Sequence, residues 1–87
     1  MKFRKKPVVI EAIQFDGSKE NFREMKRVFR KKFKDCVYFA DSGNMYISTW
    51  EGKMLVDIGD WVIKDTDGWL YPCKKDIFEM TYEKVEE

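Results

Sequence analysis

Turn residues divide the second half of this chain into short segments, and this spacing constrains its fold more than any other feature. Each segment is apolar or alternates apolar with polar residues, a pattern typical of antiparallel strands joined by tight turns. The predicted turns are DSGN (41–44), EGK (51–53), Gly59-Asp60 and DTDG (65–68). We predict strands over residues 36–40, 45–50, 54–58, 61–64 and 69–71, the last one stopped by Pro72.

One strand and one helix are predicted before this region. Residues 8–15 (VVIEAIQF) place apolar side chains on both faces of a strand, and Asp16-Gly17 ends it. Ser18 can cap the next helix, which we predict over residues 19–34. An apolar stripe at helical spacing should pack on a sheet, and its members are Phe22, Met25, Val28, Phe29 and Phe33.

After Pro72 we predict one helical turn over residues 74–79 and a closing strand over residues 80–85. The predicted fold class is therefore α+β, with one amphipathic helix packed on a bent antiparallel sheet of five to seven short strands. The 87 residues should form a single domain, 1–87. Because so short a chain has a small core, and self-association buries further surface, we expect a homo-oligomer.

The composition argues against catalytic chemistry. The chain has no histidine, and its glycines stand singly at turns, so it lacks both the commonest general base and a glycine-rich phosphate loop. Most aspartates of the second half also sit at turns, where they bond their own backbone. Two cysteines without histidine cannot form the usual zinc site. We therefore predict a protein that is not an enzyme and holds no metal or cofactor.

The N-terminal residues predict neither a signal peptide nor a membrane helix. The basic residues 2–6 lead only to the apolar run Val8-Val9-Ile10, far shorter than the roughly 20 residues that a membrane helix needs. We expect a soluble cytoplasmic protein, with Cys36 and Cys73 as buried free thiols.

Charge is distributed unevenly, although the formal net charge is only +1. Residues 1–35 hold twelve Lys or Arg and five Asp or Glu, whereas residues 36–87 hold five and eleven. The basic part could meet an anionic ligand, nucleic acid or the acidic part of a second copy, or it could be a solvated helix face. The near-neutral total counts against nucleic acid as the partner.

A binding site is easier to assemble from these residues than a catalytic one. A nucleobase stacks on aromatic rings, and phosphate groups bind Arg or Lys. The tryptophans could equally fill the core, and Asp76 could cap the turn at residues 77–78 instead of accepting from a ligand. The candidate ligand-binding residues are Arg4, Arg23, Arg27, Trp61, Tyr71, Lys74 and Asp76.

Both ends of the chain carry the marks of a known family. Residues 4–15 (RKKPVVIEAIQF) resemble the opening of a widespread family of small phage and prophage proteins. Residues 59–63 (GDWVI), with YPCK at 71–74, DIFE at 76–79 and TYE at 81–83, resemble its closing segment. This family is similar to the phage anti-Thoeris sponges. The resemblance implies a non-enzymatic oligomer that sequesters a cyclic ADP-ribose-type nucleotide between its subunits and so blunts a host immune response.

Three functions are open at this point. The first is a binding module that sequesters an anionic nucleotide signal. The second is a protein-interaction or virion-assembly accessory factor that docks a phage or host protein through the basic helix or the acidic half. The third is a nucleic-acid binder that uses the basic face over residues 23–34.

Overall fold

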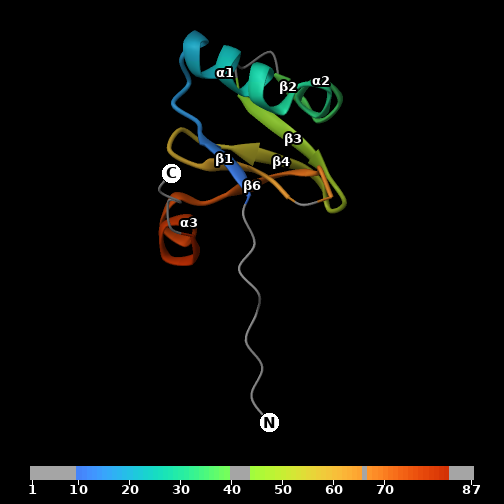
Figure 1. Cartoon of the computed structure of the whole chain (residues 1–87). Helices are drawn as coiled ribbons and strands as arrows, with labels where there is room; N and C mark the ends of the chain where they lie inside the picture. Colours follow the sequence, from blue (N-terminus) through green and yellow to red (C-terminus); the bar gives the residue numbers. More distant parts are fainter. Residues whose placement is uncertain (1–9, 40–43, 66, 83–87) are drawn as a thin grey trace.

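The computed structural model describes residues 10–39, 44–65 and 67–82, which form a mixed α+β arrangement (Figure 1). Two antiparallel sheets of three strands each, in the orders β1-β5-β6 and β2-β3-β4, pack with three helices in this part of the chain. The elements are β1 (Glu11–Gln14), α1 (Lys19–Phe29), α2 (Lys31–Cys36), β2 (Val37–Phe39), β3 (Met45–Thr49), β4 (Gly52–Val56), β5 (Trp61–Lys64), β6 (Leu70–Cys73) and α3 (Lys75–Thr81).

The predicted single bent sheet is divided in two by the turn at residues 57–60. Strand β4 ends at Val56, two residues before the predicted end, and β5 pairs with β1 instead, with Ile13 opposite Val62. Backbone hydrogen bonds join this turn to the end of β1: Phe15 donates to the Asp60 carbonyl over 2.8 Å, and Gly59 donates to the Phe15 carbonyl over 2.7 Å. Pairing with β1 therefore carries the chain out of one sheet and into the other.

The predicted helix over residues 19–34 is interrupted at Arg30. Arg30 has φ 53° and ψ −127°, outside the helical region, and it separates α1 from α2, which continues to Cys36. The predicted cap is confirmed, since the Ser18 hydroxyl accepts a hydrogen bond from the Asn21 N–H over 3.1 Å. Phe29 of α1 and Phe33 of α2, on either side of this break, are both buried in the core.

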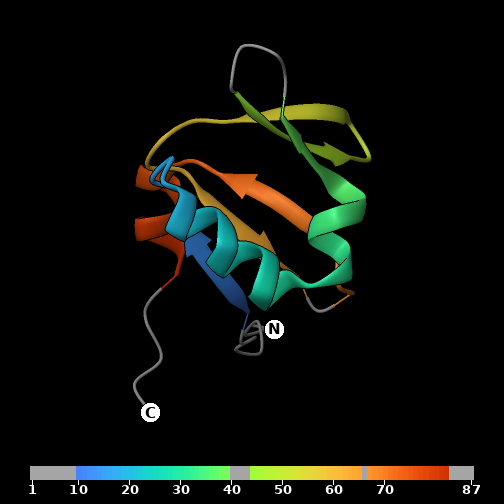
Figure 2. The same ribbon diagram turned by 90° about the horizontal axis from the view of Figure 1, so that it is seen from above.

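The core lies between the two N-terminal helices and the inner faces of both sheets. Figure 2 shows α1 lying over β1 and β5, with the β3–β4 hairpin beside it, and Figure 1 places α3 on the other side of the β1-β5-β6 sheet. The fully buried side chains are the largest contributors to this core, and they are Met25, Phe29, Met45, Ile47, Val62 and Leu70.

The C-terminal part differs most from the prediction. Strand β6 runs through Pro72 to Cys73, because β6 is an edge strand where the missing N–H of proline breaks no ladder bond. Helix α3 is longer than the predicted single turn and includes Met80 and Thr81, and Tyr82 is its C-cap, so the predicted strand over 80–85 is wrong at these three residues. The predictions for residues 8–9, 40–43, 66 and 83–85 fall outside the described residues.

Both cysteines are free thiols, as predicted, but they differ in burial. Cys36, at the end of α2, is buried, whereas Cys73, at the end of β6, is only partly buried. Burial, and then the carboxylates of Asp60 and Asp76, raise the pKa of the Cys73 thiol. The expectation of two buried thiols therefore holds for Cys36 alone.

Candidate functional site

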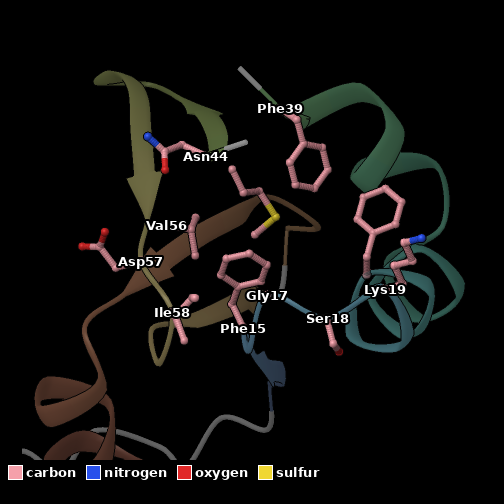
Figure 3. A pocket seen from close by; sticks show the side chains of 11 residues that line it. Phe15, Gly17, Ser18, Lys19, Phe39, Asn44, Val56, Asp57 and Ile58 are labelled. Atoms are coloured by element: carbon pink, nitrogen blue, oxygen red, sulfur yellow. The ribbon is translucent and has the colours of Figure 1, made fainter. Parts of the chain in front are cut away.

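A groove of about 620 Å³ opens between the start of α1, the ends of β2 and β3, and the chain that follows β4 (Figure 3). We call it the Phe39 groove. Its residues come from four separate segments of the chain: Phe15, Gly17, Ser18, Lys19, Phe22, Phe39, Asn44, Met45, Val56, Asp57 and Ile58.

Aromatic and aliphatic side chains form the walls of the Phe39 groove. Phe15 is buried, and Phe22 packs edge-to-face on Phe39 with ring centroids 5.0 Å apart. Phe39 remains 47% exposed, so part of its ring is open to solvent. Figure 3 shows Val56 and Ile58 on the side of the groove opposite Phe39. Such walls suit a ligand with a flat apolar ring system.

The turn before α1 shapes one end of the groove. Gly17 has φ 80°, and a Cβ atom there would lie 3.2 Å from Cδ1 of Ile58, so a glycine lets the two segments approach closely. The Asp16 carboxylate accepts a hydrogen bond from the Ser18 N–H over 2.7 Å. Hydrogen bonds from the Ser18 hydroxyl and backbone hold the pKa of Asp16 below its ordinary value.

Asn21 fixes the start of α1 against the end of β1, and sequence reasoning did not select it. Its side chain is buried, its Nδ2 donates to the Gln14 carbonyl over 2.7 Å, and its Oδ1 accepts from the Asp16 N–H over 3.1 Å. The sequence did carry a signal, because Asn21 lies four residues before Met25 on the apolar stripe. A polar residue on a buried helical stripe indicates a side chain that bonds the backbone.

Lys74 and two aspartates form an ion-pair cluster beside the groove. The Lys74 ammonium lies 2.8 Å from Oδ2 of Asp57 and 3.1 Å from Oδ2 of the buried Asp60. Hydrogen bonds to Asp57, and then to Asp60, raise the pKa of Lys74. Lys74 was predicted to bind a ligand, but its ammonium is held by two carboxylates, one of which lines the groove.

The remaining predicted site residues do not meet in one place. Arg23 and Arg27 lie on the exposed face of α1, where they line a shallow hollow together with Glu20 and Glu24. Trp61 stacks on Phe78 of α3, with ring centroids 4.1 Å apart and planes at 10°, on the side of the sheet away from α1. Arg4 lies outside the described residues.

Asp76 and Tyr71 interact with other groups than the predicted cations in the contacts described. Asp76 is exposed in the first turn of α3, where its carboxylate accepts a hydrogen bond from the Ile77 N–H over 3.0 Å. The N-cap residue of α3 is Lys74, and not Asp76 as the capping alternative had it. Tyr71 lies on β6, and burial followed by the carboxylates of Asp65 and Asp67 raises its pKa. The six candidates in the described residues therefore do not form one anion-binding site.

Trp50 lies between two further hollows at the tip of the β3–β4 hairpin. It is 84% exposed, the largest exposed fraction among the described tryptophans. One hollow, of about 470 Å³, lies between Trp50 and Trp69, and the Lys32 ammonium sits 4.2 Å from the centroid of the Trp69 ring. The other, of about 450 Å³, lies between Trp50 and Tyr71.

Within residues 10–39, 44–65 and 67–82, no three Cys, Asp or Glu side chains are grouped in a way that could hold a metal ion. In the same residues, every helix is too short or too polar to cross a membrane. Comparisons with protein-family models, with curated proteins and with solved structures found no match.

Proposed function

We propose that this chain is a non-enzymatic binding module whose Phe39 groove holds a small anionic ligand with an aromatic ring, as nucleotides have. The observation that carries the proposal is that three phenyl rings and the side chain of Lys19 line one groove of about 620 Å³. This volume lies within the range of roughly 300–1,000 Å³ typical of small-molecule sites. The proposal needs no chemical step, only rings for a base and a cation for a phosphate.

The half-exposed ring of Phe39 is the stacking surface for the base. The ring of Phe39 packs against the ring of Phe22. Phe22 packs in turn on the buried Phe33, with ring centroids 5.0 Å apart, so this wall of the groove is in contact with the core. Stacking of a base on an aromatic side chain contributes about 1–3 kcal/mol. Phe39→Ala should therefore weaken binding by roughly five- to 150-fold.

Lys19 supplies positive charge at the rim. Asp57, the carboxylate that also lines the groove, is already paired with Lys74, so its repulsion of an anionic ligand is reduced. Lys19 is the first residue of α1, where the helix dipole adds a partial positive charge. A ligand phosphate at this end would meet both charges.

The sequence resemblance adds the identity of the ligand to this proposal. It indicates a cyclic ADP-ribose-type nucleotide, sequestered between the subunits of a homo-oligomer in the cytoplasm of a bacterial host. The binding role of the groove does not depend on these additions, because any nucleotide of suitable size would test the rings and Lys19.

In the experiment, the purified protein is titrated with cyclic ADP-ribose isomers and with AMP, and the melting temperature (Tm) is measured at each ligand concentration. A ligand that binds only the folded state raises Tm, and Phe39→Ala and Lys19→Ala should reduce this rise. Lys26→Ala is the matched control, because Lys26 is exposed on α1 and does not line the groove. An unchanged Tm at millimolar ligand, or equal rises in wild type and Phe39→Ala, would contradict the proposal.

A second candidate function is docking of another protein. Three large apolar side chains are highly exposed in the described residues: Trp50 at 84%, Ile58 at 75% and Met80 at 87%. Exposed tryptophan and methionine are enriched in protein interfaces. Recovery of one partner at stoichiometric yield from infected cells, and its loss with Trp50→Ala, would favour this function.

A further inference from the structure

The hollow on the Tyr71 side of Trp50 has the composition of a site for a positively charged group. We call it the Trp50 hollow; its lining residues are Thr49, Trp50, Glu51, Met54, Tyr71 and Pro72. Trp50 and Tyr71 come from the β3–β4 turn and from β6, which lie next to each other (Figure 1). The hollow measures about 450 Å³, which is enough for a side chain.

The charge around the Trp50 hollow is negative. Glu51 lines it directly, and its described lining includes no Lys or Arg. Asp65 and Asp67 are close enough to raise the pKa of the Tyr71 hydroxyl, after the effect of burial. The Asp65 carboxylate is held in place, since its Oδ1 accepts from the N–H groups of Asp67 and Trp69, both over 2.9 Å.

Two other rings of this protein already hold ammonium groups. Lys32 Nζ lies 4.2 Å from the centroid of Trp69, and Lys53 Nζ lies 4.8 Å from that of Tyr38. The negative face of an aromatic ring attracts a cation, most strongly for tryptophan. No cation of the described residues lies over Trp50, although it is the most exposed indole among them and has a carboxylate next to it in the sequence.

We propose that the Trp50 hollow binds the guanidinium or ammonium group of an Arg or Lys side chain that a partner protein presents on a basic segment. The charge of the surrounding part fits such a partner, because residues 44–82 hold seven Asp or Glu and four Lys or Arg. Trp50 provides a ring face, Tyr71 a second ring, and Glu51 the counter-charge. This site is separate from the Phe39 groove and does not depend on a nucleotide.

The surface that Arg23 and Arg27 offer in a second copy of the chain fits this site less well than a separate partner does. The exposed arginines of α1, Arg23 and Arg27, share their surface with Glu20 and Glu24. Docking that surface on the hollow would bring two carboxylates against Glu51, and like charges at short distance repel. We therefore assign the site to a partner whose basic side chain lacks neighbouring acidic residues.

The test is an NMR titration that follows the indole N–H of Trp50, assigned by its loss in Trp50→Phe. The probe is a capped Gly-Gly-Arg-Gly-Gly peptide, whose only charge is the arginine, and its control has citrulline, a neutral group of the same shape, in place of arginine. The arginine peptide should shift the Trp50 and Tyr71 resonances, and it should bind roughly two- to fivefold more tightly than the citrulline peptide, as expected for a cation over an exposed indole. Equal affinity of the two peptides, or no shift at millimolar peptide, would overturn the proposal.

Variants separate this site from its surroundings. Glu51→Gln and Trp50→Ala should each weaken the peptide several-fold. Glu79→Gln removes an exposed carboxylate of α3, and Phe39→Ala alters the groove, so both should leave peptide affinity unchanged. Shifts of Trp50 on raising the protein concentration alone would show that a second copy fills the hollow, and would overturn the assignment to a partner.

Discussion

The ammonium of Lys74 lies 3.1 Å from Oδ2 of Asp60, the most deeply buried aspartate of the described residues. The same oxygen accepts the Asp57 N–H over 3.0 Å, and the Asp60 carbonyl accepts the Phe15 N–H. The pair therefore joins the residues that lead into α3 to the turn that holds β5 against β1. In the sequence, Asp60 belongs to the GDW motif and Lys74 to the YPCK motif, and the ion pair connects the two motifs.

Replacement of Lys74 by methionine should lower Tm. The variant keeps the length of the side chain but leaves the buried Asp60 carboxylate without its cation, and an uncompensated buried charge is unfavourable. Lys75→Met is the control, because Lys75 is exposed and forms no described ion pair. Thermal unfolding followed by circular dichroism measures both, and equal Tm values for the two variants would show that the pair does not stabilise the fold.

The stabilisation of the folded state by the Lys74 ion pair should disappear at high pH. Its pKa is raised above the ordinary value of 10.5 by hydrogen bonds to Asp57 and Asp60, so the folded state binds this proton more tightly than the unfolded state. The stabilisation is therefore complete below pH 10.5 and is lost as the pH rises through the raised pKa. The Tm difference between wild type and Lys74→Met should shrink over that interval; a constant difference would contradict this account.

Asn21→Ala should destabilise the protein by about 2 kcal/mol, since it removes two hydrogen bonds from a buried side chain and leaves their backbone partners unpaired. Urea unfolding at neutral pH measures the free energy. Glu24→Ala, an exposed change on the same helix, should stay within about 0.5 kcal/mol of wild type. A small effect of Asn21→Ala would mean that water replaces its bonds, and that the start of α1 is held by other contacts.

Arg30→Gly should stabilise the protein. At φ 53° and ψ −127° a side chain is strained, at a cost of about 1–3 kcal/mol, whereas glycine adopts this conformation freely. The greater conformational entropy of glycine in the unfolded chain lowers the free energy of unfolding by about 0.5–1 kcal/mol, so the expected net stabilisation is about 1 kcal/mol. Arg30→Ala removes the charge but keeps Cβ, and should give no such gain. If both variants have the same free energy of unfolding, backbone strain at Arg30 is not the cause.

Cys73 should react slowly with iodoacetamide near neutral pH and faster as the pH rises past the ordinary thiol value of 9.0. Burial, and then Asp60 and Asp76, raise its pKa, and only the thiolate is nucleophilic. Asp76→Asn removes one carboxylate from the surface and should speed alkylation at a fixed pH. Peptide mass spectrometry distinguishes Cys73 from the buried Cys36. Glu79→Gln serves as control, and equal rates in the two variants would argue against the influence of Asp76.

Much of the secondary structure could be predicted because its signals are local. The strand over residues 61–64 has the predicted bounds, the hydroxyl of Ser18 caps α1, and Met25, Phe29 and Phe33 are buried as their spacing indicated. The errors arose where a distant segment decides the outcome. Pro72 remains in a strand because β6 lies at a sheet edge, and the helix changes direction at Arg30 although nothing in the local sequence marks a break.

The candidate site was harder to predict than the fold. The resemblance and the composition directed attention to the tryptophans and arginines, whereas the groove is lined by Phe15, Phe39 and Lys19, which none of those arguments selected. Phenylalanines on predicted strands look like core residues; Phe15 is indeed buried, and only the 47% exposure of Phe39 distinguishes it from a core residue. Trp61 was predicted to bind a ligand, but its ring is instead covered by Phe78 of α3.

By itself, the amino-acid sequence determined which short segments become helices and strands and which of their faces turn inward, because periodicity and capping act over a few neighbouring residues. Only the tertiary structure decided that the strands divide into two sheets and that a groove forms between Phe15, Phe39 and Asp57. These residues are far apart in the chain. They meet because backbone hydrogen bonds from the turn at residues 57–60 to Phe15, together with burial of a shared core, outweigh the local preferences of each segment.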